Sequence, residues 1–405
     1  MMVYCSFIVV YFCARLALAL AKAKSDIPQN KTISIDPELT YLILPDYVGN
    51  VIQNFIDTKT SNTRTSALIT SAKSAAFISY DPEFLSLLGT APTVTLVAQR
   101  NYSFANEAGI WVPDRNEVWF TSSTINDTTK ISVLKLKTSE IYSPSTSIPI
   151  INPNGGTYFD HKIYFAGDGN ATVSPAIYAI DPNTGHTQVI INSYFGIPFN
   201  GPNDLTWVNH LGTPYLFFTD DPLSSLYDGG PPAVLPDAVW RFSPTAKSLV
   251  PVISRADILV PNGINVNSAM DTLYITDTTP ITTTDSGGYN SGSNAIYKFD
   301  LDFNMFPINK RLVGISRTGI PDGIHIDDKN RIWTAETEGI VVRNDMGKVL
   351  GLFNAEVFLG EPVGQSGIEI ANFALAGDIL VVEGSGKLWT VQLADVVVSS
   401  DRYIL

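Results

Sequence analysis

The amino-acid sequence predicts an all-β fold, a β-propeller of six blades, on two observations. The chain of 405 residues contains 29 Gly and 25 Pro, and short runs rich in Val, Ile, Tyr, Phe and Trp stand between them. Such runs bounded by turn formers are typical of β-strands, and no sustained helical period accompanies them. In addition, a phrase of about fifty residues recurs six times, which is a length typical of one propeller blade.

Each copy of the repeat opens with an acidic or amide residue, usually in a Gly/Pro setting. An alternating strand, a polar turn and a second strand follow, then a third strand and in several copies a fourth. Neighbouring opening residues are 47 to 60 positions apart in the chain. The opening residues are Glu107, Asn154, Asn203, Asn262, Asp322 and Asn372. Six such units predict six blades.

A closed propeller needs a strand from the other end of the chain in its last blade. The segment 93–98, of sequence Thr-Val-Thr-Leu-Val-Ala, stands just before the first repeat and is our candidate. A closed ring leaves few unpaired strand edges. We therefore assign residues 91–405 to the propeller and residues 22–90 to an N-terminal extension. Within that extension, residues 58–74 are rich in Ser, Thr and Lys and are expected to form a linker or surface loop.

The first 21 residues form the only long apolar stretch of the sequence. The stretch is interrupted by Arg15 and ends in Ala19-Leu20-Ala21, a small-x-small pattern that predicts a cleaved signal peptide and secretion. An uncleaved membrane anchor is the alternative. Both cysteines, Cys5 and Cys13, lie within this stretch, so the rest of the chain contains no thiol for a disulfide or a cysteine nucleophile.

Four N-glycosylation sequons agree with an extracellular location. They begin at Asn30, Asn101, Asn126 and Asn170. After signal cleavage we expect no stable association with a membrane, because no other segment approaches the length and apolarity of a membrane helix. The oligomeric state is left open by the sequence.

Composition and charge exclude several classes of protein. With 45% hydrophobic and 16% charged residues, the chain can bury a large core and is not disordered. The net charge of −13, without basic runs, argues against nucleic-acid binding. No Gly-x-Ser-x-Gly, Walker or Rossmann motif is present, which argues against a serine hydrolase or a nucleotide-dependent enzyme.

In a propeller the first strand of each blade lines the central channel, so the six opening residues should point towards the axis. Turn formation is the alternative, because Asn-Gly and Asp-Gly are common turn formers, but Glu107 is a poor turn residue. Carboxylate and carboxamide oxygens with only two formal charges suit a hard divalent cation. We expect Ca²⁺ first, with Mg²⁺, Mn²⁺ or Zn²⁺ as alternatives, in a six-bladed β-propeller with a central metal-binding channel. A polar channel without an ion is the second reading.

Three further residues are candidates for substrate binding. Asn154 and Asn372 are assigned to substrate contact or a structural role rather than to the metal. His325 follows Asp322 by three positions on a predicted channel strand, so it can contact a substrate, although strand histidines are more often packed or hydrogen-bonded in place.

Several short pieces jointly resemble the SMP-30/gluconolactonase/LRE-like superfamily of six-bladed propellers, and most closely its secreted fungal lactonohydrolases. The pieces span about residues 90–393 and keep the order of the family. They are Asn106-Glu-Ala, Ile151-Asn-Pro-Asn-Gly-Gly-Thr-Tyr, Tyr194-Phe-Gly, Asn203-Asp, Val260-Pro-Asn-Gly-Ile and Ile320-Pro-Asp-Gly-Ile-His. The resemblance implies a Ca²⁺-type ion held by one Glu, two Asn and one Asp. The matching positions here are Glu107, Asn203, Asn262 and Asp322.

The resemblance also implies hydrolysis of a sugar-type or related lactone to its hydroxy acid. A metal would polarise the carbonyl, and Asp322 would act as the catalytic base or as the nucleophile. The alternatives are a non-catalytic ligand-binding propeller with a structural Ca²⁺ and a paraoxonase-like esterase. The latter usually has histidine pairs, whereas only His325 is available on a channel strand. The loops 221–236 and 278–293 are expected to shape the substrate entrance.

Overall fold

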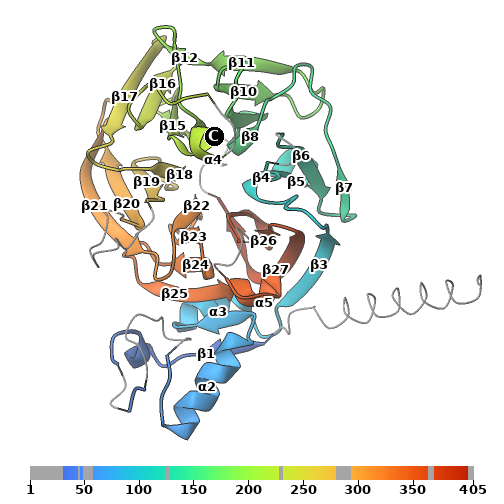
Figure 1. Ribbon diagram of the computed structural model, residues 1–405, viewed down its shortest axis with the longest axis vertical. Helices are drawn as coiled ribbons and strands as arrows, with labels where there is room; N and C mark the ends of the chain where they lie inside the picture. Colours follow the sequence, from blue (N-terminus) through green and yellow to red (C-terminus); the bar gives the residue numbers. More distant parts are fainter. Residues whose placement is uncertain are drawn as a thin grey trace, which may run out of the picture.

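A computed structural model describes residues 31–43, 46–48, 58–124, 128–227, 231–279, 293–363 and 369–399 (Figure 1). The predicted signal peptide and the sequons at Asn30 and Asn126 lie outside the described residues. Six sheets surround a central axis, so the predicted six-bladed β-propeller is confirmed.

The first four blades are four-stranded sheets, each built from consecutive strands of the chain. Blade one contains β4 (Glu107–Val112), β5 (Glu117–Thr121), β6 (Ile131–Lys135) and β7 (Glu140–Tyr142), and blade two contains β8 (Pro153–Phe159), β9 (Lys162–Gly167), β10 (Ala176–Ile180) and β11 (Thr187–Ile191). Blade three contains β14 (Pro202–His210), β15 (Thr213–Asp220), β16 (Ala238–Ser243) and β17 (Ser248–Ser254), and blade four contains β18 (Pro261–Val266), β19 (Thr272–Asp277), β20 (Ala295–Leu301) and β21 (Pro307–Ile315).

The last two blades bring the two ends of the chain together. Blade five contains β22 (Pro321–Ile326), β23 (Ile332–Glu336), β24 (Gly339–Arg343) and β25 (Val349–Asn354). Blade six contains β26 (Asn372–Gly384), β27 (Lys387–Val398) and β3 (Thr93–Gln99). The predicted closing strand is confirmed, because β3 pairs antiparallel with β27, with Leu96 opposite Trp389 and Val94 opposite Val391.

Short elements connect or cover the blades. They are η3 (Pro113–Arg115), β12 (Ser193–Tyr194), β13 (Ile197–Pro198), α4 (Leu223–Tyr227) and α5 (Ala355–Leu359). Helix α4 belongs to the loop between β15 and β16, and it lies near the centre of the ring in Figure 1.

The N-terminal extension packs on the propeller and widens one of its blades. It contains β1 (Thr32–Ser34), η1 (Pro37–Thr40), α2 (Thr63–Lys73), β2 (Phe77–Ser79) and α3 (Pro82–Leu88). Strand β2 pairs with β25 and β1 pairs with β2, so blade five becomes a six-stranded sheet. The outer edges of β25 and β2 are thereby paired.

The expectation of a linker or loop over residues 58–74 was wrong, because helix α2 occupies most of that segment. Asn62 caps the helix, its Oδ1 accepting a hydrogen bond from Thr65 N at 3.0 Å. Only Ile69 and Ala72 are buried along the helix, so its apolar face is small and most of its surface consists of polar residues, chiefly Ser and Thr. A helix held by so few buried positions gives little periodic signal in the sequence.

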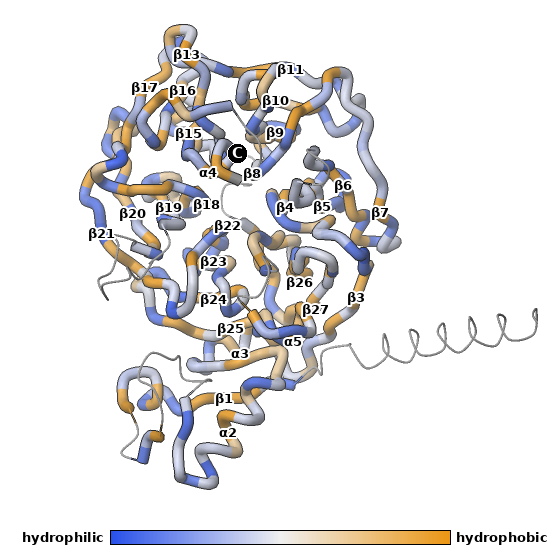
Figure 2. The backbone as a smooth tube through the Cα atoms, viewed as in Figure 1, coloured by the Kyte–Doolittle hydropathy of each residue, from blue (hydrophilic) through white to orange (hydrophobic). Residues whose placement is uncertain are grey.

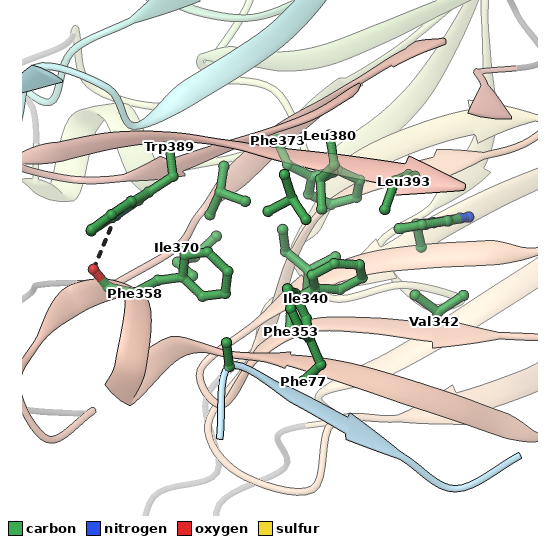
Figure 3. Packing of buried hydrophobic residues seen from close by; sticks show 14 of the residues in the cluster. Phe77, Ile340, Val342, Phe353, Phe358, Ile370, Phe373, Leu380, Trp389 and Leu393 are labelled. Carbon is green, nitrogen blue, oxygen red and sulfur yellow. Dashed lines mark hydrogen bonds between the residues drawn. The ribbon is translucent and has the colours of Figure 1, made fainter. Parts of the chain in front are cut away.

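The core between blades five and six also holds the extension in place. Figure 3 shows Phe77 of β2 among Phe353 and Ile340 of blade five, with Trp389 of blade six across the cluster. The Trp389 indole donates to the Phe358 carbonyl at 3.0 Å, the bond drawn in the figure. Figure 2 shows hydrophobic and hydrophilic stretches alternating along the blades. No helix within the described ranges is long and apolar enough to cross a membrane.

Candidate metal centre at the channel mouth

The first strands of the six blades surround the axis of the propeller, and each contacts its neighbour around the ring (Figure 1). These strands are β4, β8, β14, β18, β22 and β26. Each opening residue is the first or second residue of its strand. We call the six opening residues the channel ring.

A β-bulge lies at this point in four blades and directs the ring residue out of the regular ladder. In blade five, Pro321 pairs with Glu336 and Ile324 pairs with Thr334, so Asp322 and Gly323 together face one residue of β23. The same irregularity occurs at Asn154, Asn203 and Asn262. Because a bulge re-aims side chains, these residues are not hairpin turn formers, and the turn interpretation of the Asn-Gly pairs was wrong.

Blade one builds its ring position differently. Its bulge consists of Ala108 and Gly109, with φ of 82° and 57°, and Glu107 precedes the bulge as the ladder partner of Thr121. Glu107 therefore stands one register position earlier than the ring residues of blades two to five. A Cβ at Gly109 would lie 2.0 Å from the Phe373 carbonyl oxygen, so only glycine fits there.

The glycines that follow three ring residues make room for the next blade. A Cβ at Gly155 would lie 2.5 Å from the Asn203 carbonyl oxygen, and one at Gly263 would lie 2.5 Å from the Asp322 carbonyl oxygen. A Cβ at Gly323 would lie 2.6 Å from the Asn372 side chain. The recurring Asn-Gly and Asp-Gly pairs thus serve close packing of neighbouring first strands around the axis.

Threonines at or near the ends of second strands fix the backbone of the ring residue in the following blade. The Thr219 hydroxyl donates to the Asn262 carbonyl at 2.6 Å, and the Thr276 hydroxyl donates to the Asp322 carbonyl at 2.8 Å. Thr121 makes a longer bond to the Asn154 carbonyl, at 3.3 Å. Each hydroxyl therefore holds a bulged backbone that belongs to the next sheet.

Asn372 connects the two acidic members of the ring. Its Nδ2 donates to Glu107 Oε2 at 3.1 Å, and its side chain lies against Gly323, the residue that follows Asp322. Burial raises the pKa of Glu107 well above its ordinary value, and the nearby charge of Asp322 raises it further, whereas the hydrogen bond from Asn372 opposes the shift. Glu107 and Asp322 therefore lie close enough to influence each other, as one shared site requires.

Asp322 experiences the same electrostatic setting. Burial raises its pKa well above the ordinary value, and the charge of Glu369 and then of Asp204 adds to the shift, while a hydrogen bond from Asn262 lowers it. No basic side chain among the described residues contributes to the pKa shift of Glu107 or Asp322. Ionising both carboxyls together is thus unfavourable unless a cation is present.

Three carboxylates near the ring were not predicted from the sequence: Asp204, Glu369 and Glu383. Asp204 accepts backbone N–H bonds from Leu205 at 2.8 Å and Ile264 at 3.1 Å. The signal for Asp204 was visible, since an acidic residue stands where three other blades have glycine. The other two belong to the last blade, where the repeat is degraded, and they had no comparable signal.

The residues present fit a hard divalent cation. The ring offers only carboxylate and carboxamide groups, and Asn154 Oδ1 is buried without a hydrogen-bond partner in the described part of the chain. Within the same residues, no group of three or more His, Cys, Asp or Glu side chains is placed to hold a metal ion. A site here would therefore depend on asparagine oxygens, with Glu107, Asn203, Asn262 and Asp322 as the predicted ligands.

His325 lies on β22 but is 5% exposed and packed edge-on against Phe373, with 5.0 Å between ring centroids. Its Nε2 lies 2.9 Å from the Phe373 carbonyl oxygen, and its Nδ1 lies 3.3 Å from Ser399 Oγ. These contacts favour the packed, structural reading of His325, and its substrate contact stays a prediction. The same holds for Asn154 and Asn372.

Two predicted glycosylation sites lie in the described residues. Asn101 is exposed, whereas Asn170 is half-buried and its Oδ1 accepts from the backbone N–H groups of Thr172 and Val173, each at 2.9 Å. Asn101 is therefore the more accessible acceptor.

The fold and the ring define a class of protein: a six-bladed propeller whose first strands begin with carboxylate and carboxamide residues around the axis. Residues 105–354 match the model of the SMP-30/gluconolactonase/LRE-like region. The chain therefore belongs to the SMP-30/gluconolactonase/LRE-like family, as the sequence motifs predict.

Individual relatives agree with this assignment. The chain is 28% identical to the lactonohydrolase oryL of Aspergillus oryzae over 271 residues, which cover 61% of this chain and 60% of that relative. It thus spans about 60% of the relative's length. The solved gluconolactonase XC5397 of Xanthomonas campestris superposes with a TM-score of 0.59 at 19% identity, over 78% of this chain and 94% of the other. The calcium-binding protein regucalcin of Agrobacterium tumefaciens gives a TM-score of 0.50 at 16% identity, over 75% and 94%.

Proposed function

We propose that the protein is a metal-dependent lactonohydrolase that opens a sugar-type or related lactone to the hydroxy acid. The observation that carries the proposal is the channel ring, where Asn372 donates to Glu107 and where burial and then the charge of Asp322 raise the pKa of Glu107. Family membership and the activity named for the fungal relative support the reaction class.

A hard divalent cation, Ca²⁺ first, would be held by Glu107, Asn203, Asn262 and Asp322. When bound, it would polarise the lactone carbonyl and stabilise the negative charge that develops on its oxygen. The raised pKa values of the two carboxyls support this assignment, because a cation at the site offsets the cost of ionising both.

Asp322 is the proposed general base. Its carboxylate accepts a proton from water as the water oxygen bonds to the carbonyl carbon. The ring C–O bond then breaks, and the proton returns to the departing alkoxide, which becomes the hydroxyl of the product. The Thr276 hydroxyl and Asn262 hold this carboxylate in place through the backbone and the side chain, respectively.

The test is a panel of aldono-, aromatic and macrocyclic lactones, assayed with a strong chelator and again after Ca²⁺ is added back. The proposal predicts hydrolysis that stops on chelation and returns with Ca²⁺. Hydrolysis indifferent to the chelator would contradict the metal's role. An inert panel together with Ca²⁺-dependent stabilisation would instead favour the non-catalytic binding propeller.

The paraoxonase-like alternative is less well supported, because His325 is buried and engaged by Phe373 and Ser399. We further propose that the protein is secreted and N-glycosylated, on the pattern of residues 1–21 and the sequons. N-terminal sequencing of protein from the culture medium should begin after Ala21. Glycosidase treatment should lower its apparent mass, and the Asn101→Gln variant should lose part of that shift.

A further inference from the structure

A second group of buried carboxylates lies beside the channel ring, in the loops of blades two and three. Asp168 follows β9, Asp220 ends β15, Asp221 follows it and Asp237 precedes β16. Each of the four is at most 4% exposed. Asp220 pairs with Pro202, the residue before ring member Asn203, so the group lies at the ring's end of the propeller.

Little positive charge is available to these residues. Arg255 Nη1 lies 3.4 Å from Asp237 Oδ2, but its side chain is 63% exposed. Asp220 and Asp221 form no salt bridge within the described ranges. Asp220 Oδ1 accepts from Gly201 N at 2.9 Å. Buried carboxylates in folded proteins are normally paired, bound to a metal ion or protonated. The Asp221 carboxylate, which forms no salt bridge in the described residues, therefore requires a cation or a proton.

Two polar atoms of the α4 loop are buried without any partner in the described residues. Asp221 Oδ1 accepts from Leu223 N at 2.8 Å, but Asp221 Oδ2 has no hydrogen bond, and the residue is 1% exposed. Ser224 Oγ is also unpaired, at 3% exposure. Because the serine hydroxyl is neutral, its lack of a hydrogen-bond partner is a second observation, separate from the clustering of carboxylates.

These groups meet around Gly201. A Cβ at Gly201 would lie 2.7 Å from Ser224 Cβ, 3.4 Å from the Asp221 carbonyl oxygen and 3.5 Å from Asp168 Oδ1. Glycine at this position therefore allows the α4 loop to pack closely on β14, next to the Asp168 carboxylate of blade two. The approach of the loop explains the glycine, whereas no described residue satisfies Asp221 Oδ2 or Ser224 Oγ.

We infer that Asp168, Asp221 and Ser224 bind a second hard divalent cation, Ca²⁺ by its preference for oxygen ligands, beside Gly201. Two carboxylates would neutralise the ion, and the hydroxyl would add a third protein oxygen to a coordination shell of about six to eight that water can complete. The ion would fasten the segment 221–224, which leads into α4, to blade two. Burial raises the pKa of Asp221 well above its ordinary value, and the charges of Asp168, Asp220 and Asp237 add to this shift, which a bound cation would offset.

The experiment counts Ca²⁺ ions per folded chain by equilibrium dialysis and atomic emission, with calorimetric titration of the metal-free protein. The account predicts two ions for the wild type. Asp322→Asn should remove or weaken only the channel ion, and Asp221→Asn only the second ion, each lowering the stoichiometry by one. Ser224→Ala should weaken the second ion at least about fivefold and leave the channel ion intact.

Circular dichroism and thermal unfolding establish that each variant is folded. If Asp221→Asn does not fold, the Ca²⁺ binding of Ser224→Ala tests the second site. Two outcomes overturn the inference: a single ion whose affinity is unchanged by Ser224→Ala or Asp221→Asn, and two ions that both persist in these variants. Neither outcome depends on lactone hydrolysis. Conversely, Asp322→Asn protein that still binds two ions would contradict the channel site and leave the second site standing.

Discussion

The channel ring and the buried carboxylates around Gly201 both gather acidic oxygens at one end of the propeller, but they are built in different ways. The ring takes one residue from the start of the first strand of every blade, whereas the second group comes from loops of blades two and three alone. The ring is bridged by carboxamides such as Asn372, while the second group encloses an unpaired oxygen of Asp221. Repetition thus places one polar residue of each blade around the axis, whereas loops of two neighbouring blades supply the second group.

The largest expected difference concerns catalysis. Asp322→Asn should lower kcat/KM for the best lactone by about 10²–10⁴-fold, because the variant loses the general base and one ligand charge with almost no change in volume. At saturating Ca²⁺, Asp221→Asn should lower it far less, since that carboxylate lies outside the ring. The exposed Asp345→Asn variant is the control and should retain activity. Steady-state kinetics decide, and equal losses for Asp322→Asn and Asp345→Asn would contradict the role of Asp322.

The next effect concerns stability against pH without metal. Carboxyl pKa values are raised at both sites, to about 7 for Asp220, where burial is the main cause. A raised acid pKa leaves stability intact below the ordinary value near 4 and lowers it as the pH rises through the folded-state pKa. In chelator, the thermal midpoint should therefore fall between pH 5 and pH 8, by about 2 °C for each kcal/mol lost.

Added Ca²⁺ should reverse this fall, and its stabilising effect should be larger at pH 8 than at pH 5. The variants separate the two regions. Asp322→Asn should remove the part of the pH dependence that comes from the channel ring, and Asp221→Asn should remove the part that comes from the carboxylates around Gly201. A midpoint in chelator that is constant or rises over this range would show that the carboxyls are already compensated within the protein.

The smallest effect concerns the threonines behind the ring. Thr276→Val removes the hydroxyl that binds the Asp322 carbonyl, so it should cost about 1 kcal/mol of unfolding free energy and weaken Ca²⁺ binding several-fold. Thr276→Ser should restore the affinity. Thr206→Val in β14 is the matched control, because the Thr206 hydroxyl is buried without a hydrogen-bond partner in the described residues and its loss should be neutral or stabilising. Calorimetric titration and denaturant unfolding measure both quantities, and equal behaviour of the two valine variants would refute a positioning role.

The repeated parts of the molecule could be predicted from the sequence because each blade restates the same pattern. Six blades, the closing strand β3 and the ring positions all follow from the strand runs and the opening residues. The offset of Glu107 by one register position could not be predicted, because it depends on left-handed backbone at Ala108 that no composition rule favours.

The parts that occur once were harder to predict. Helix α2 has two buried residues and many Ser and Thr, so its segment looked like a linker, although it lies beside a sheet edge that the extension covers. The group around Asp221 is drawn together by the packing of a loop on a neighbouring blade, which no local pattern encodes. Asp204 is intermediate between the repeated parts and the parts that occur once. Its position in the repeat could be predicted, but its carboxylate was not assigned to the site.

The most direct test of the central claim is anomalous diffraction from crystals of the protein grown with Ca²⁺. The account predicts a calcium peak on the propeller axis, about 2.3–2.6 Å from side-chain oxygens of Glu107, Asn203, Asn262 and Asp322. An axis without a peak in crystals of Ca²⁺-loaded, lactone-hydrolysing protein would contradict it.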